Sequence, residues 1–241
     1  MLLLLAPATA QEPLPDGFVY LRDFDPTIVQ DMRYAGADNF TGRPLPGYDA
    51  AECVLKHETA AALKQVQADL ASEGLALKVY DCYRPRRASR AMAQWATTGD
   101  IDGKRHFPRL QKNALFALGY IALSSAHATG SAVDLTLVRR NAAPAAVFNQ
   151  AGKYGSCAGP IEQRGPDTGI DMGTGFDCFD AASHTRSPAI TDEQRAWRTR
   201  LVAAMAKHGF HNYFREWWHF TYAPRLPAAS YDFPVRPRPP G

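Results

Sequence analysis

The sequence predicts a single α+β domain with a central, mostly antiparallel sheet flanked by helices. Helix-like and strand-like segments follow one another without the regular βαβ rhythm that indicates a parallel sheet. The chain has no internal repeat and no low-complexity linker that would divide it. Its 241 residues are 46% hydrophobic, so one large domain can bury a substantial core.

The N-terminal half predicts loops, then a strand between two helices. Residues 11–50 are rich in proline, glycine, aspartate and tyrosine, and we expect loops with short strands there. An apolar stripe through 54–73 predicts a helix, which Gly74 is placed to end. The segment 75–83 alternates in polarity like a strand, and Pro85 can start the next helix.

The C-terminal part predicts one further helix, a strand and a tail. Thr191 and Gln194 form a capping-box pair, and the apolar periodicity that follows stops at Gly209. Residues 216–223 are the last strand candidate. The proline-rich tail 224–241 is expected to lie extended over the surface.

The charge balance argues against two classes of partner. The formal net charge is +3, and the basic residues are scattered apart from those at 83–90. This charge is too mild to indicate binding to nucleic acid or to a membrane surface. No stretch approaches the roughly 18 consecutive apolar residues of a membrane span, so no stable membrane insertion is expected.

The first ten residues resemble the end of a secretory signal. Residues 2–5 are all leucine, and residues 8–10, Ala-Thr-Ala, fit the small-x-small pattern before a signal-peptidase cut. The positively charged start of a signal is missing, and a frayed apolar start is the alternative. We therefore expect a residual signal-peptide-like segment at 1–10, a domain at 11–241, and a periplasmic or secreted protein.

The four cysteines favour disulfides. None belongs to a CxxC pair, so a zinc ribbon is not expected. An even count in an exported chain favours disulfide bonds, with buried free thiols as the alternative. Three pairings are possible, and we favour Cys53 with Cys82 because they flank one helix. Cys157 and Cys178, which flank one glycine-rich loop, would then form the second pair.

His127, Asp134 and His219 form a candidate metal centre. Each alone has an ordinary explanation, as a surface or core histidine or as a turn cap. In AVDLTLV, however, the aspartate faces away from the apolar side chains beside it. An ionised aspartate in a buried strand is costly unless it is paired or binds a metal. The flexible link ATGSA would let the histidine fold back toward it, and three such ligands suit a catalytic zinc site.

The segment around His219 adds a candidate general base. Glu216 and His219 lie three residues apart, so a flat strand would place them on opposite faces, whereas a bulge or strand end could converge them. Trp217 and Trp218 would wall the site, or simply pack in the core. Glu216 would then accept a proton from water, as the glutamate of HExxH enzymes does. Arg84 follows a predicted strand and could hold an oxyanion, with a surface arginine as the alternative.

The segments SSAHATGSAVDLTL at 124–137 and EWWHF at 216–220 together resemble the D-alanyl-D-alanine dipeptidases. These are zinc peptidases with a hedgehog-like α+β fold, related to the zinc D,D-carboxypeptidases. The resemblance runs from about residue 18 to about residue 235. Four further segments agree with it: MRYAGADNFTG at 32–42, YDCYRPRRA at 80–88, DMGTGFDCFD at 171–180 and YDFPV at 231–235.

The resemblance implies roles for seven residues. One zinc ion per chain would have three protein ligands, His127, Asp134 and His219. Glu216 would be the catalytic base and Arg84 the residue that stabilises the transition state. Ser125 and Asp177 match positions that the family uses near the N-terminal end of the substrate.

We therefore expect zinc-dependent hydrolysis of the small dipeptide D-Ala-D-Ala to free D-alanine. A D,D-carboxypeptidase that trims peptidoglycan stem peptides is the alternative enzyme. A zinc-structured binding module is the alternative from another class, against which the presence of Glu216 and Arg84 argues. The stretch 149–170 looks longer than in the simplest family members, carries Cys157 and could alter the entrance to the site. No oligomeric state is predicted.

Overall fold

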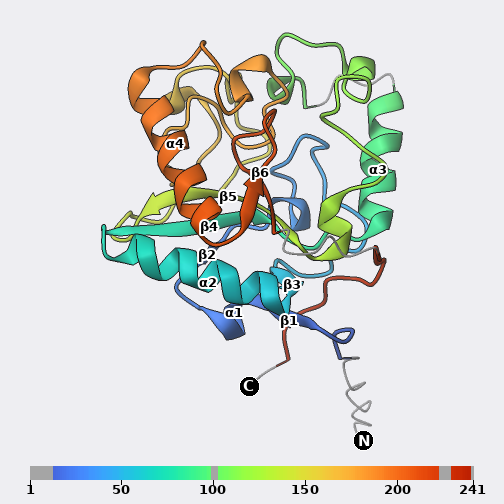
Figure 1. The fold of residues 1–241 in the computed structure, drawn as a ribbon. Helices are drawn as coiled ribbons and strands as arrows, with labels where there is room; N and C mark the ends of the chain where they lie inside the picture. Colours follow the sequence, from blue (N-terminus) through green and yellow to red (C-terminus); the bar gives the residue numbers. More distant parts are fainter. Residues whose placement is uncertain (1–12, 99–102, 223–228, 240–241) are drawn as a thin grey trace, which may run out of the picture.

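A five-stranded sheet forms the centre of the protein (Figure 1). Its strands, in spatial order, are β2 Val29–Gln30, β4 Leu75–Asp81, β5 Ala132–Arg139, β7 His219–Tyr222 and β6 Phe210–Asn212. β2 runs parallel to β4, and the other neighbouring pairs are antiparallel, which confirms the predicted α+β class. The computed structural model describes residues 13–98, 103–222 and 229–239, so the expected signal-like segment 1–10 lies outside the described residues.

The helices lie on both sides of this sheet. The α-helices of the described part are α1 Leu21–Phe24, α2 His57–Ala71, α3 Arg86–Thr97 and α4 Asp192–Lys207. Short 3-10 helices occur at Arg33–Ala35, Lys104–His106, Lys112–Ala114, Ala126–Thr129, Ile161–Gln163 and Ala181–Ser183. Figure 1 shows α2 running along β4 on one side, while the long irregular segments between α3 and α4 cover the other.

The first predicted helix begins later than expected. Residues 54–56 form strand β3 Val54–Lys56, which pairs with β1 Phe18–Tyr20 in a separate two-stranded sheet, and α2 starts only at His57. The apolar side chains that looked like part of a helical stripe are therefore buried by strand pairing. This long-range pairing overrides the local helical pattern.

β5 is buried on both faces. The side chains of Ala132–Val138 are all buried because neighbouring strands lie on both edges and chain segments cover both faces. Asp134 and Thr136 line cavities on the face covered by the irregular segments. The polar side chains that interrupt this strand therefore mark the side of the sheet on which cavities form.

The C-terminal helix agrees with its predicted signals, but the last strand is shorter than predicted. Thr191 and Gln194 form the capping box of α4, and Gly209 follows the helix with a φ of +84°. Residues 216–218 form a turn rather than strand, closed by hydrogen bonds from Glu216 N to Tyr213 O and from His219 N to Glu216 O. β7 starts only at His219.

The described part of the proline-rich tail does more than cover the surface. Val235 is fully buried and pairs with Tyr48 in an isolated parallel bridge. Phe233 stacks on Tyr83 at 4.1 Å between ring centroids. The extended tail therefore contributes to the core. Among the described residues, no helix has the length and apolarity required to cross a membrane.

Candidate active site

Backbone pairing places the three predicted metal ligands together. Asp134 in β5 lies directly opposite His219 in β7, so their side chains emerge on the same face. His127 lies on the short 3-10 helix that precedes β5, with Ser125 capping its start. Gly130 ends this helix at a φ of +78°, and a Cβ there would lie 2.3 Å from Phe18. Glycine is therefore required where the chain turns from His127 into β5.

The ligand atoms of the three residues converge. His127 Nε2 lies 3.0 Å from His219 Nδ1 and 3.3 Å from Asp134 Oδ1, and His219 Nδ1 lies 3.0 Å from Asp134 Oδ1. A tetrahedral zinc ion with bonds of 2.0–2.1 Å would separate its ligand atoms by about 3.3 Å. Two imidazole nitrogens and one carboxylate oxygen at these separations fit a zinc ion in both chemistry and spacing.

Neighbouring groups orient the cluster for a cation. His127 Nδ1 lies 2.7 Å from the Cys82 carbonyl, to which it would donate, leaving Nε2 as the lone-pair donor. Burial disfavours ionisation of Asp134, but the two histidines outweigh it and hold the pKa of its carboxyl below the usual range. The cluster therefore presents an ionised carboxylate and an oriented imidazole.

Glu216 lies beside this cluster, in the turn before β7. Its Oε2 is 3.9 Å from His219 Nδ1, and its side chain is 13% exposed. Burial, followed by the carboxylates of Asp134 and Asp177, raises the pKa of Glu216 well above its usual value. Because the chain turns before β7, Glu216 and His219 both line this cavity, although their spacing would place them on opposite faces of a flat strand.

Arg84 is held at the edge of the same cluster. Its Nε donates to Asp81 Oδ2 at 2.9 Å, and its Nη2 lies 3.6 Å from Asp134 Oδ2. Its guanidinium carbon lies 5.0 Å from the centroid of the Tyr34 ring. The side chain is only 13% exposed, so Arg84 is a fixed cation in the site rather than a surface arginine.

Ser125 and Asp177 line the same cavity, but their surroundings differ. Ser125 Oγ accepts a hydrogen bond from His127 N at 3.2 Å, so it belongs to the turn that carries a candidate metal ligand. Asp177 is buried, and its Oδ2 accepts a hydrogen bond from Tyr34 Oη at 2.7 Å. Burial, followed by the negative charge of Asp134, raises the pKa of Asp177 to about 8.

The cavity that contains these groups is small. Its volume is about 230 Å³, below the roughly 300–1,000 Å³ typical of sites for drug-sized ligands. Its apolar wall includes Phe40, Met92, Tyr120, Ile121 and Phe179. Sequence reasoning assigned no role to Tyr34, although this residue lies in the segment MRYAGADNFTG that carried part of the resemblance.

The long stretch 149–170 does not line this cavity in the described structure. Its residues line instead a second cavity of about 220 Å³, which also borders Thr136 and Phe176. The two disulfides have the pairing favoured from the sequence, Cys53 with Cys82 and Cys157 with Cys178. The stretch is therefore linked to the site by a disulfide: Cys157 is bonded to Cys178, the residue that follows Asp177.

Comparisons with known proteins show which proteins this chain resembles. The family described as D-ala-D-ala dipeptidase matches residues 15–146 and 162–235. A D-alanyl-D-alanine dipeptidase of Enterococcus faecium is 32% identical over 225 residues, which cover 91% of this chain and 98% of that protein. One of Streptomyces coelicolor is 32% identical, over 90% of this chain and 98% of that protein. One of Escherichia coli is 30% identical, over 86% and 83%.

Proposed function

Since the chain belongs to the D-Ala-D-Ala dipeptidase family and is a metallopeptidase, we propose that it hydrolyses free D-Ala-D-Ala to D-alanine with one zinc ion. The observation that carries this proposal is the convergence of His127, Asp134 and His219 in one small cavity with Glu216 and Arg84. A binding module without catalysis would not require a buried glutamate and a fixed arginine beside the ligands.

The residues of the chain divide the chemistry among them. Zinc, when bound by the three ligands, would polarise the scissile carbonyl and lower the pKa of water. Glu216, whose ionised form the positive charge of the metal would favour against the burial and the neighbouring carboxylates that raise its pKa, would accept the proton of the attacking water and return a proton to the leaving amine. Arg84, fixed by Asp81, stabilises the negative charge that develops on the carbonyl oxygen.

Asp177 supports the preference for a free dipeptide. It accepts a hydrogen bond from Tyr34 but has no ion pair among the described residues, although it is buried. The ammonium of D-Ala-D-Ala would supply the missing positive charge, with Ser125 nearby. Burial raises the pKa of Asp177 because its ionised form has no ion-pair partner in the described chain, and the substrate ammonium would stabilise that ionised form, which gives the site a reason to prefer substrates with a free amino group.

The test compares free and blocked substrates. We expect release of D-alanine from D-Ala-D-Ala, and its loss when a chelator removes the metal. Blocking the ammonium, as in N-acetyl-D-Ala-D-Ala, should lower kcat/KM on the order of a thousandfold, because it leaves Asp177 buried without a partner. Comparable kcat/KM on D-Ala-D-Ala and on a pentapeptide stem would instead establish a D,D-carboxypeptidase.

We also propose that the protein acts in the periplasm or outside the cell. The apolar first residues and the two disulfides support this compartment, because disulfides persist in oxidising surroundings. Fractionation of cells that produce the full chain provides the test. Recovery of the protein only in the cytoplasm, with reduced thiols, would contradict the proposal.

A further inference from the structure

Asp177 has an unusual backbone conformation. It is the only non-glycine residue with a positive φ, +54°, within the described parts of the chain. Aspartate adopts this left-handed conformation at a cost, and such residues persist where the surrounding structure holds them. The position of the Asp177 carboxylate therefore depends on what restrains its backbone.

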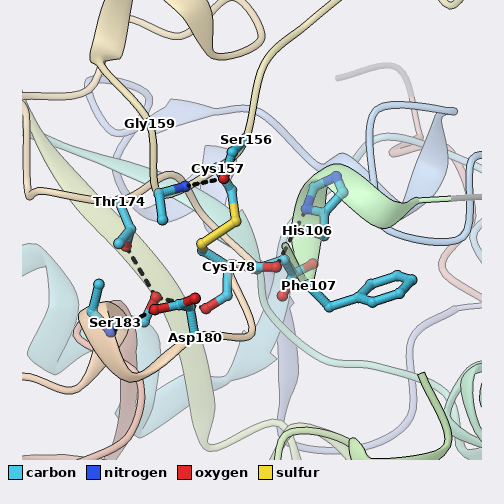
Figure 2. The surroundings of a disulfide bond; sticks show 12 residues. His106, Phe107, Ser156, Cys157, Gly159, Thr174, Cys178, Asp180 and Ser183 are labelled. Carbon is cyan, nitrogen blue, oxygen red and sulfur yellow. Dashed lines mark hydrogen bonds between the residues drawn. A yellow bond between two sulfur atoms is a disulfide. The ribbon is translucent and has the colours of Figure 1, made fainter. Parts of the chain in front are cut away.

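Two restraints converge on this backbone. Cys178, the next residue, is fully buried and bonded to Cys157. The Asp177 carbonyl lies 3.3 Å from His106 Nδ1, which would donate a hydrogen bond to it. Figure 2 shows the disulfide beside His106, with the hydrogen bond drawn from the imidazole ring.

The segment Lys104–His106 is hydrogen-bonded to the chain near both cysteines of this disulfide. Cys157 N donates to Arg105 O at 2.9 Å, and Phe179 N donates to His106 O at 2.7 Å. Gly175 N also donates to Cys157 O at 2.8 Å. The disulfide therefore closes a ring of contacts between the segment 104–106, the loop around Asp177 and the stretch that carries Cys157.

One cysteine of the Cys157–Cys178 disulfide lies in a segment that the family match leaves out. The match leaves residues 147–161 out, and Cys157 lies among them. None of these residues lines the cavity of the candidate active site. The unmatched segment can therefore affect the site only indirectly. Its disulfide restrains the backbone next to Asp177, and its residues do not line the cavity.

We propose that the Cys157–Cys178 disulfide and His106 are positioning elements for Asp177, and that discrimination between free and N-blocked D-Ala-D-Ala depends on them. The inference rests on the proposed function, in which Asp177 binds the substrate ammonium. Without these restraints the backbone can relax toward negative φ, which turns the carboxylate away from the ammonium. The ammonium contact exists before and during the reaction, so its loss raises KM more than it lowers kcat.

Remaining contacts limit the expected effect. Ser183 Oγ donates to the Cys178 carbonyl at 2.6 Å, and Tyr34 still donates to the Asp177 carboxylate. Removal of the disulfide therefore loosens the loop without releasing it. We expect an effect of about tenfold, below the roughly hundredfold that a displacement of 1 Å can cause.

The experiment uses the double variant Cys157→Ala, Cys178→Ala, with kcat and KM measured on D-Ala-D-Ala and on N-acetyl-D-Ala-D-Ala. We expect KM for the free dipeptide to rise about tenfold, the ratio of the two kcat/KM values to fall by a similar factor, and metal content to stay unchanged. The matched control is the double variant Cys53→Ala, Cys82→Ala. That disulfide lies beside the carbonyl facing His127, so its removal affects both substrates alike and leaves the ratio intact.

A second pair of variants decides the matter if the cysteine variant does not fold. His106→Ala removes the donor to the Asp177 carbonyl and should lower the ratio of kcat/KM for D-Ala-D-Ala to kcat/KM for N-acetyl-D-Ala-D-Ala. His106→Asn keeps a donor at the Nδ1 position, so this ratio should stay close to that of the wild type. A wild-type enzyme that cuts both substrates equally would overturn the proposed function and this inference with it. A wild-type enzyme that discriminates, with an unchanged ratio in the folded variants, would overturn the positioning role alone.

Discussion

Replacing His106 with asparagine should make the free energy of unfolding less dependent on pH below 6.5. His106 is buried, and burial, followed by the charge of Arg105, lowers its pKa from 6.5 to about 3. Between these two values the unfolded chain binds a proton that the folded protein does not bind. The free energy of unfolding therefore decreases as the pH falls below 6.5, and this loss levels off only near pH 3.

The magnitude follows from the two pKa values. At pH 5 the unfolded imidazole is about 1.5 pH units below its pKa, while the folded imidazole is still neutral. Lowering the pH from 7.5 to 5 should therefore cost the wild-type protein about 2 kcal/mol through His106 alone. For a chain of this size that corresponds to a decrease in Tm of roughly 4–8 °C.

The assay is denaturant unfolding of the wild type and of His106→Asn at pH 7.5 and pH 5, with the disulfides oxidised and the metal removed from both. The asparagine keeps a donor toward the Asp177 carbonyl but does not titrate. All other groups are common to the two proteins, so the difference between their pH dependences isolates His106. Equal losses of stability in both proteins would refute the reasoning.

Four further expectations concern the site and the cysteines. Replacing His127, Asp134 or His219 with alanine should greatly weaken zinc retention, and metal analysis that finds full zinc in His219→Ala would exclude that ligand. Glu216→Gln should keep the metal but lose about two to four orders of magnitude in kcat, so turnover like that of the wild type would remove Glu216 as the base. Tyr34→Phe should lower kcat/KM for D-Ala-D-Ala about tenfold, because Tyr34 donates to the Asp177 carboxylate that would bind the substrate ammonium. The kcat/KM for N-acetyl-D-Ala-D-Ala should not change, and steady-state kinetics on both substrates checks this. Thiol titration of unfolded, unreduced protein should find no free cysteine, and mass mapping that pairs the cysteines differently would contradict the structure.

The clustering of the candidate metal ligands could be predicted in part, because Asp134 and His219 lie in sequence contexts that are unusual without a shared site. Asp134 is a charged residue in a strand that is otherwise buried, and this conflict indicates a partner for its carboxylate. The spacing of Glu216 and His219 requires a turn or bulge if both face one site, and the structure contains a turn. Such local conflicts are visible in a sequence without knowledge of distant contacts.

The parts that sequence reasoning missed depend on distant contacts. Residues 54–56 form a strand because β1 pairs with them, and the helical stripe carries no sign of that pairing. The tail enters the core because Val235 pairs with Tyr48, far away in the chain. Tyr34 meets Asp177 across 143 residues, and His106 meets its carbonyl across 71, so no local pattern marks either contact.

The pairing of Asp134 with His219 has a consequence for the order of biosynthetic events. These two candidate ligands are 85 residues apart, and His219 belongs to the strand that comes last in the sequence among the described strands of the sheet. A partly synthesised chain that ends before β7 therefore lacks a complete ligand set, however well its earlier segments fold. Contacts between such distant residues also form late, because closing long loops is entropically costly. Metal loading should thus follow synthesis, and the compartment in which the chain finishes folding determines which metal pool supplies the enzyme.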